Sequence, residues 1–400
     1  MIASVFCSFS LYLSHRRSRG HHIGFEDCRR SSSDDAPSTA ENYVDGPGPV
    51  LLLNGFGVGS FHQHRLMPRL ASASASSSSP GDRAIYGIDY LGQGRSWPVD
   101  MDDGESEGEK GLRYDINTWA DQCINFIERV VLPEQGGRVS KVHLVGNSVG
   151  GYLSVVLASK RPDLIDSICL LNATPVWGLN LPFWSGRLPA PFLPKLIGRF
   201  LFDRIRDYGT IEKFLDQTYS RREAFDDELM GQIRDCTEGL GGHAAFASIL
   251  WSPPADFSSG GSAGDGAADA TEATDFYVSL ERLECDVLLL FGRDDPWCKP
   301  AFAKRMCEML DRRRVSTGRV HRYVELEDTG HCPNHEAPQA TAAAVNRWLA
   351  ACTPGERSVV ELVHGGRERF AEPWGEIAMR EVSKNEISLN FLDRLVTKLI

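Results

Sequence analysis

"VHLVGNSVGGYL", residues 142–153, decides the fold, because a short apolar run breaks at a serine between glycines and then turns apolar again. Val142 to Val145 is rich in β-branched residues, which predicts a buried strand. Tyr152 to Ser159 suits a helix, and the Lys-Arg-Pro sequence directly after it would end that helix. Ser148 therefore lies on a turn between a strand and a helix. This pattern is typical of a nucleophile elbow, in which a sharp turn exposes a serine hydroxyl.

On both sides of this stretch, predicted strands and helices alternate along the chain. The predicted strands span residues 50–53, 84–88, 142–145, 168–171, 287–291 and 322–326. The predicted helices span residues 62–67, 116–131, 151–159, 301–310 and 337–349. Repeated strand–helix units predict a mostly parallel, doubly wound sheet of the α/β class.

Composition changes along the chain predict its domain organisation. A Pro/Trp/Phe-rich start and a low-complexity loop interrupt the alternation at residues 176–275, which we expect to form a helical cap inserted over the site. The core then comprises residues 48–175 and 276–352. Residues 1–47 are expected to be a targeting or poorly ordered segment, because the first 25 residues are rich in Arg and Ser. Residues 20–47 carry little strand pattern, so the sheet is expected to lack an edge there. Residues 353–400 form an extension ending in an amphipathic helix.

The charge balance and the hydropathy pattern exclude several classes of protein. The chain has 43 basic and 54 acidic residues, a net charge of -11, and no long Lys/Arg run, so a nucleic-acid partner is not expected. No stretch approaches the roughly 18 apolar residues of a membrane-spanning helix. The apolar face of the predicted C-terminal helix favours packing onto the domain, with peripheral membrane contact as the weaker alternative. Ten cysteines lie singly, which favours free thiols.

A serine nucleophile needs a base, and the base needs an acid to orient it. The strand in "DVLLLFGRDDPW" is followed by Asp294 and Asp295, and "YVELEDTGHCPNHEAP" contains His331 after the next strand. The order Ser148, Asp295, His331 is that of the α/β-hydrolase fold. Asp295 is preferred as the acid because of its spacing from Gly292, and Asp294 is the alternative.

Ester cleavage also needs donors for the developing oxyanion. The backbone N–H of Val149, directly after the candidate nucleophile, is the first expected donor. The second is the N–H of Phe56 in the glycine-rich loop "NGFGVGSF", which follows the strand at residues 50–53. A phosphate-binding loop is the rival interpretation, but the loop lacks the Gly-Lys-Ser/Thr sequence of that motif.

The remaining candidate positions concern metals and substrate. His331 and His335 are four residues apart, but Pro333 between them and the lack of further ligands argue against a metal site. We expect no metal and no cofactor. Aromatic residues are dense in the predicted cap and indicate an apolar chamber for a bulky substrate. The expected substrate-binding residues are Trp177, Phe183, Trp184 and Phe246.

Several stretches together resemble the pheophytinase group of plastid α/β-hydrolases. They are "NGFGVGSFH" (54–62), "GIDYLGQGRSWP" (87–98), "GNSVGGYL" (146–153), "LLNATPVWG" (170–178), "FASILWSP" (246–253), "FGRDDPWC" (291–298) and "GHCPNHEAP" (330–338). The resemblance implies an α/β-hydrolase fold and a plastid serine carboxylesterase of chlorophyll breakdown. Such an enzyme cleaves the phytyl ester of pheophytin, a small hydrophobic tetrapyrrole substrate, through an acyl-enzyme. It also implies that Ser148 is the nucleophile, Asp295 the acid and His331 the base.

Two alternatives to this function stay open at the level of sequence. One is another plastid esterase on the same fold, such as a chlorophyll dephytylase or a lipid lipase. The other is a non-catalytic ligand receptor built on the same fold.

Overall fold

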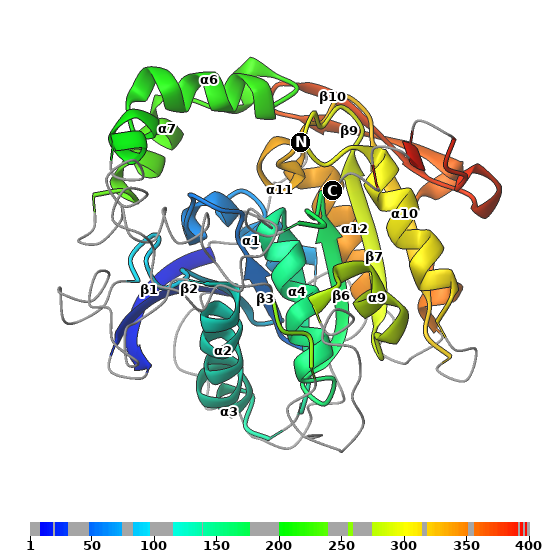
Figure 1. Ribbon diagram of the computed structural model, residues 1–400, viewed down its shortest axis with the longest axis horizontal. Helices are drawn as coiled ribbons and strands as arrows, with labels where there is room; N and C mark the ends of the chain where they lie inside the picture. Colours follow the sequence, from blue (N-terminus) through cyan, green and yellow to red (C-terminus); the bar gives the residue numbers. More distant parts are fainter. Residues whose placement is uncertain are drawn as a thin grey trace, which may run out of the picture.

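The computed structural model describes residues 9–18, 21–30, 48–73, 83–96, 115–137, 139–176, 200–238, 255–258, 274–313, 318–350, 356–390, 393–394 and 397. These residues form a ten-stranded sheet with helices on both faces (Figure 1). The strand order is β1-β2-β4-β3-β5-β6-β7-β8-β10-β9. No helix within the described ranges is both long and apolar enough to cross a bilayer.

The six predicted strands form the parallel centre of the sheet. They are β3 (Val50–Leu53), β4 (Ile85–Ile88), β5 (Val142–Asn147), β6 (Ile165–Leu171), β7 (Asp286–Gly292) and β8 (His321–Leu326). Successive side chains of a strand point to opposite faces. Leu51 and Leu53 accordingly pack into the core on one face, and Val50 and Leu52 into the core on the other. Because both faces are buried, β3 and most of β7 are continuous apolar runs.

Two layers of helices cover the sheet. One layer consists of α2 (Ile116–Phe126), which continues through a π-helical turn (Ile127–Val131) into α3 (Leu132–Glu134), and of α4 (Val149–Lys160), α9 (Phe276–Arg282) and α10 (Pro300–Asp311). The other consists of α1 (Met67–Ala73) and α12 (Pro338–Ala350), preceded by the short α11 (Pro333–Glu336). Short 3-10 turns span Ser60–Gln63, Arg222–Ala224, Glu356–Ser358, His364–Gly366 and Lys384–Glu386.

The expectation that the sheet lacks an edge before residue 48 was wrong. Strands β1 (Phe9–Ser18) and β2 (His21–Arg30) pair antiparallel, and β2 adds to β4. Ile23 and Phe25 are both buried, and the ring of Phe25 lies 4.9 Å from that of Phe126. Their two-residue alternation is short and lies among polar residues, so the local pattern was weak. The targeting role remains an expectation.

The C-terminal extension also contributes to the sheet, which the sequence pattern did not indicate. Strands β9 (Arg367–Glu372) and β10 (Gly375–Glu381) form a hairpin, and β10 pairs antiparallel with β8. The predicted amphipathic helix after it lies largely outside the described residues. Leu389, at the start of that stretch, is buried.

Two helices within the predicted cap lie apart from both layers. They are α6 (Tyr208–Thr218) and α7 (Asp227–Asp235), drawn in green at the top of Figure 1. Each begins at an aspartate, Asp207 or Asp226, whose side chain accepts a backbone N–H of the first turn. Their apolar residues form a separate small core that includes Cys332, beside the loop after β8. The cap helices therefore lie at the end of the sheet where the candidate residues gather.

Candidate active site

Ser148 occupies a sharp turn between β5 and α4. Its φ is 54°, a positive value that a residue with a side chain rarely adopts. The flanking glycines explain how the turn packs, since a Cβ on Gly146 would lie 2.2 Å from the carbonyl oxygen of Gly150. A Cβ on Gly150 would lie 2.2 Å from the carbonyl oxygen of Leu53. The turn thus has the geometry of a nucleophile elbow.

Asp295 and His331 form a buried pair. The Nδ1 atom of His331 lies 2.6 Å from Oδ2 of Asp295, and both residues are almost inaccessible to solvent. Asp295 also accepts the backbone N–H of Trp297 at 2.7 Å. Asp294, the alternative acid, is exposed and points instead toward Arg293, 3.9 Å away. The structure therefore brings Asp295, and not Asp294, to the histidine.

The surroundings of Asp295 favour its charged form. Burial alone would raise the pKa of this carboxyl group. The neighbouring His331, the backbone N–H of Trp297 and the amide of Asn172 outweigh that effect and hold the pKa below its ordinary value. An ionised Asp295 accepts the Nδ1 proton of the imidazole, which leaves Nε2 free to act as a base.

Two asparagines that the sequence analysis did not single out hold this arrangement. Asn147, the residue before Ser148, donates from Nδ2 to the carbonyl oxygen of His331 at 2.8 Å. Asn172, at the end of β6, donates to Oδ2 of Asp295 at 2.7 Å and accepts the N–H of Gly292 at 2.7 Å. Asn147 is the last residue of β5 and Asn172 directly follows β6, so a polar residue at the end of a buried strand was the only signal in the sequence for either one.

The loop after β3 lies against the turn that carries Ser148. An oxyanion donor in this loop, such as the expected N–H of Phe56, has to lie near that serine. A Cβ on Gly55 would lie 3.6 Å from Cβ of Ser148. The loop is held in place because Gly57 donates its N–H to Oε1 of Gln93 at 2.9 Å. Val149 is the first residue of α4, a position whose N–H has no acceptor within its own helix. Phe56 and Ser148 line the same cavity.

A cavity of about 390 Å³ contains the candidate nucleophile and base. Ser148 and His331 both line it, together with apolar side chains of the cap. These cap residues include Phe202, Ile205, Ile211, Phe214 and Leu215. The expected substrate-binding residues Trp177, Phe183, Trp184 and Phe246 lie outside the described residues. Among those described, α6 and the residues before it supply the apolar wall instead.

One group of three potential metal ligands occurs within the described ranges. Atoms of Asp295, Cys298 and His331 all lie within 4.8 Å of one another. Asp295 and His331 already bond to each other, and burial raises the pKa of the Cys298 thiol well above its ordinary value. The Nδ1 atom of His331 and the Oδ2 atom of Asp295 are already engaged with each other, so these two residues suit an acid–base pair better than a metal site. His335 does not join them, because its Nδ1 atom lies near Tyr219 and Arg65.

Comparisons with known proteins identify the family and the fold of the chain. A model described as the alpha/beta hydrolase family matches residues 50–344. Pheophytinase, chloroplastic, from Arabidopsis thaliana is 27% identical over 367 residues, which cover 82% of this chain and 66% of that protein. Pimeloyl-[acyl-carrier protein] methyl ester esterase from Neisseria meningitidis is 26% identical over 297 residues, 74% of each chain.

Solved structures share the fold at lower identity. The meta-cleavage product hydrolase of Pseudomonas fluorescens superposes with a TM-score of 0.54 and 17% identity, covering 84% of this chain and 97% of that one. The epoxide hydrolase CorEH superposes with a TM-score of 0.54 and 15% identity, covering 85% of this chain and 99% of that one. These similarities concern the arrangement of the chain alone.

Proposed function

Because the chain belongs to the alpha/beta hydrolase family, we propose that it is a serine carboxylesterase that cleaves the phytyl ester of pheophytin to pheophorbide and phytol. The chain is a hydrolase acting on ester bonds. The proposed pheophytin substrate is supported most directly by an apolar cavity that is lined by both Ser148 and His331. The similarity to a pheophytinase supports the same substrate, although this chain spans 66% of that relative's length.

The proposed chemistry proceeds through an acyl-enzyme. The Oγ of Ser148 attacks the ester carbonyl carbon while His331 accepts the hydroxyl proton at Nε2. The N–H groups of Val149 and Phe56 donate to the oxyanion, and one such donor typically contributes about 3 kcal/mol. The tetrahedral intermediate collapses, the C–O bond to the alcohol breaks, and His331 delivers the proton to the leaving alkoxide. Asp295 holds the imidazole and stabilises its cationic form.

Water completes the cycle by the same steps. His331 takes a proton from a water molecule, which attacks the acyl carbon, and Ser148 leaves with that proton restored to its oxygen. The products are a carboxylic acid and an alcohol. The residues of this chain suffice for every step, so the reaction as proposed uses no cofactor.

The cavity supports a hydrophobic substrate. Its volume of about 390 Å³ is near the lower end of the roughly 300–1,000 Å³ of small-molecule sites. Apolar side chains of Phe202, Ile211 and Leu215 form its cap side, which suits a hydrocarbon arm of an ester. The chloroplast location of the pheophytinase relative supports a plastid location for this chain as part of the same proposal.

Pigment and lipid esters given separately test the proposal. Wild type, Ser148→Ala and the control Ser154→Ala are incubated with pheophytin, chlorophyll or galactolipid, and the products are separated by chromatography. Ser154 is a suitable control because it lies on α4 and donates to the carbonyl oxygen of Gly150 within the same helix. We expect pheophorbide and phytol from wild type and Ser154→Ala, and neither from Ser148→Ala.

Other outcomes point to the alternatives. Release of acid from chlorophyll or galactolipid, with no pheophorbide from pheophytin, would assign a different plastid esterase. Full biological activity of Ser148→Ala would favour a ligand receptor.

A further inference from the structure

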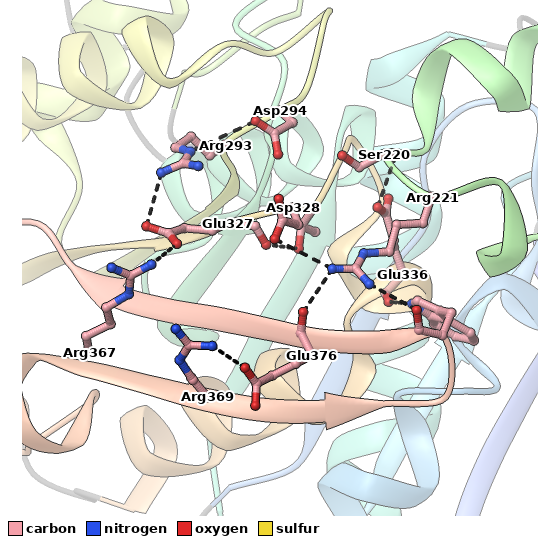
Figure 2. A network of polar contacts seen from close by, with 12 residues as sticks. Ser220, Arg221, Arg293, Asp294, Glu327, Asp328, Glu336, Arg367, Arg369 and Glu376 are labelled. Carbon is pink, nitrogen blue, oxygen red and sulfur yellow. Dashed lines mark hydrogen bonds and ion pairs between the residues drawn. The ribbon is translucent and has the colours of Figure 1, made fainter.

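Glu336 is a buried acidic residue that links the cap to the loop carrying His331. Its side chain is inaccessible to solvent. Oε1 accepts the N–H of Ser220, which follows α6, at 3.0 Å. Oε2 accepts the N–H of Gly330, the residue before His331, at 3.0 Å. One side chain on α11 therefore bonds to two segments that are far apart in the sequence. Figure 2 shows the link between Glu336 and Ser220.

The same two segments also contact each other directly. His331 donates its backbone N–H to the carbonyl oxygen of Thr218, the last residue of α6, at 2.8 Å. A Cβ on Gly330 would lie 2.2 Å from that oxygen, so only glycine permits this approach. The backbone around the catalytic imidazole is thus held by the end of a cap helix and by Glu336.

The C-terminal hairpin supports the same turn from outside. Arg221 donates from Nη1 to the carbonyl oxygen of Trp374 and from Nη2 to that of Glu376, each at 2.9 Å (Figure 2). Trp374 in turn donates its indole N–H to the carbonyl oxygen of Glu336 at 2.6 Å. The turn after α6 is therefore fixed to the core through one buried acid and one arginine.

We propose that Glu336 is a positioning residue for catalysis, which holds the His331 loop against the end of α6 and so keeps the imidazole aligned with Ser148. The proposal rests on the proposed roles of Ser148, Asp295 and His331 but not on the identity of the ester. Misplacement of a catalytic group by about 1 Å can cost about 100-fold in rate, so a second contact that fixes the loop matters for turnover.

Glu336→Gln is the informative substitution, because its shape is nearly the same and only one oxygen remains as an acceptor. The amide NH₂ group of the glutamine would face the backbone N–H of either Ser220 or Gly330. Both of these groups are donors, so no hydrogen bond can form between them. One of the two links is then lost.

Glu372→Gln is the matched control. Glu372 on β9 is also buried, and burial raises its pKa as it raises that of Glu336. Its Oε1 atom accepts the N–H groups of Gln339 and Ala340 at the start of α12, away from the His331 loop. This control therefore replaces a buried acid by its amide without breaking a contact to the loop that carries the catalytic histidine.

Both variants are assayed with p-nitrophenyl butyrate, a soluble ester whose hydrolysis does not depend on recognition of a pigment. We expect Glu336→Gln to lower kcat by about 10- to 100-fold with little change in KM, as for a misaligned catalytic group. Glu372→Gln should retain the wild-type kcat. The low-field NMR resonance of the His331 Nδ1 proton, shared with Asp295, should shift or broaden in Glu336→Gln alone.

Equal kcat values and unchanged resonances in Glu336→Gln and wild type would overturn the proposal. If Glu336→Gln does not fold, Glu336→Asp takes its place, since it keeps the charge but shortens the link. A wild-type kcat in that variant would count against the proposal equally. A wild type that hydrolyses neither p-nitrophenyl butyrate nor pheophytin would overturn the catalytic assignment itself, which is a different result.

Discussion

Asn172 and His331 bond to the same carboxylate oxygen of Asp295, at 2.7 Å and 2.6 Å. Asn172 also has a positive φ of 41°, which asparagine tolerates better than most residues. Its amide fixes the direction in which Asp295 presents its charge. The acid is therefore oriented by β6 as well as by its own loop.

Asn172→Gly is expected to lower both stability and turnover. Glycine accepts the positive φ, so the substitution removes the amide without adding backbone strain. The N–H of Gly292, which Asn172 accepts at 2.7 Å, would lose its partner, and we expect the free energy of unfolding to fall by about 1–3 kcal/mol. Denaturant unfolding and kcat with a soluble ester check this. Wild-type values for both would show that the amide does not orient Asp295.

Ser148→Gly is expected to make the protein more stable and inactive. Ser148 has a φ of 54°, a strained value that glycine adopts freely. Relief of such strain is worth about 1 kcal/mol or more, while loss of the hydroxyl removes the proposed nucleophile. Thermal unfolding of Ser148→Gly beside Ser148→Ala measures the effect, because alanine keeps the strain. A lower melting temperature for the glycine variant would contradict the explanation.

The acid side of the stability profile should depend on His62. Burial, with Arg65 and His331 nearby, lowers the pKa of His62 to about 3. The folded protein therefore keeps this ring neutral while the unfolded chain binds a proton below pH 6.5, so stability is lost as the pH falls from 6.5 toward 3. Unfolding of wild type and His62→Gln between pH 4 and 7 tests this. The slope should be smaller in the variant, and equal slopes would contradict the assignment.

The sequence predicted the parallel centre of the sheet but not its edges. Central strands such as β7 are apolar on both faces and stand out locally. By contrast, β9 reads "RERFAE", four charged residues with only two apolar ones and no alternation, and it gains its stability from pairing with β10, which no local pattern reveals.

The candidate site also contains some residues that the sequence predicted and others that it did not. The hydropathy pattern of the sequence shows where three central strands end, and the residues Ser148, Asp295 and His331 follow those ends. We could therefore expect the three side chains to lie close together. Asn172 and Asp295 are separated by 123 residues, and Glu336 acts between a helix and a loop. Such hydrogen bonds depend on the finished fold and leave no local signature. The residues that hold the site were for that reason visible only in three dimensions.

The alkaline side of the stability profile should depend on Glu336. Burial raises its pKa from 4.5 to about 8, against the opposing effects of the Gly330 and Ser220 N–H groups and of Arg221. The folded protein then binds a proton that the unfolded chain has lost, so this contribution to stability is complete below pH 4.5 and is lost as the pH rises through 8. Denaturant unfolding between pH 5 and 9 should give a steeper decline for wild type than for Glu336→Gln. Parallel declines would mean that Glu336 titrates near its ordinary value.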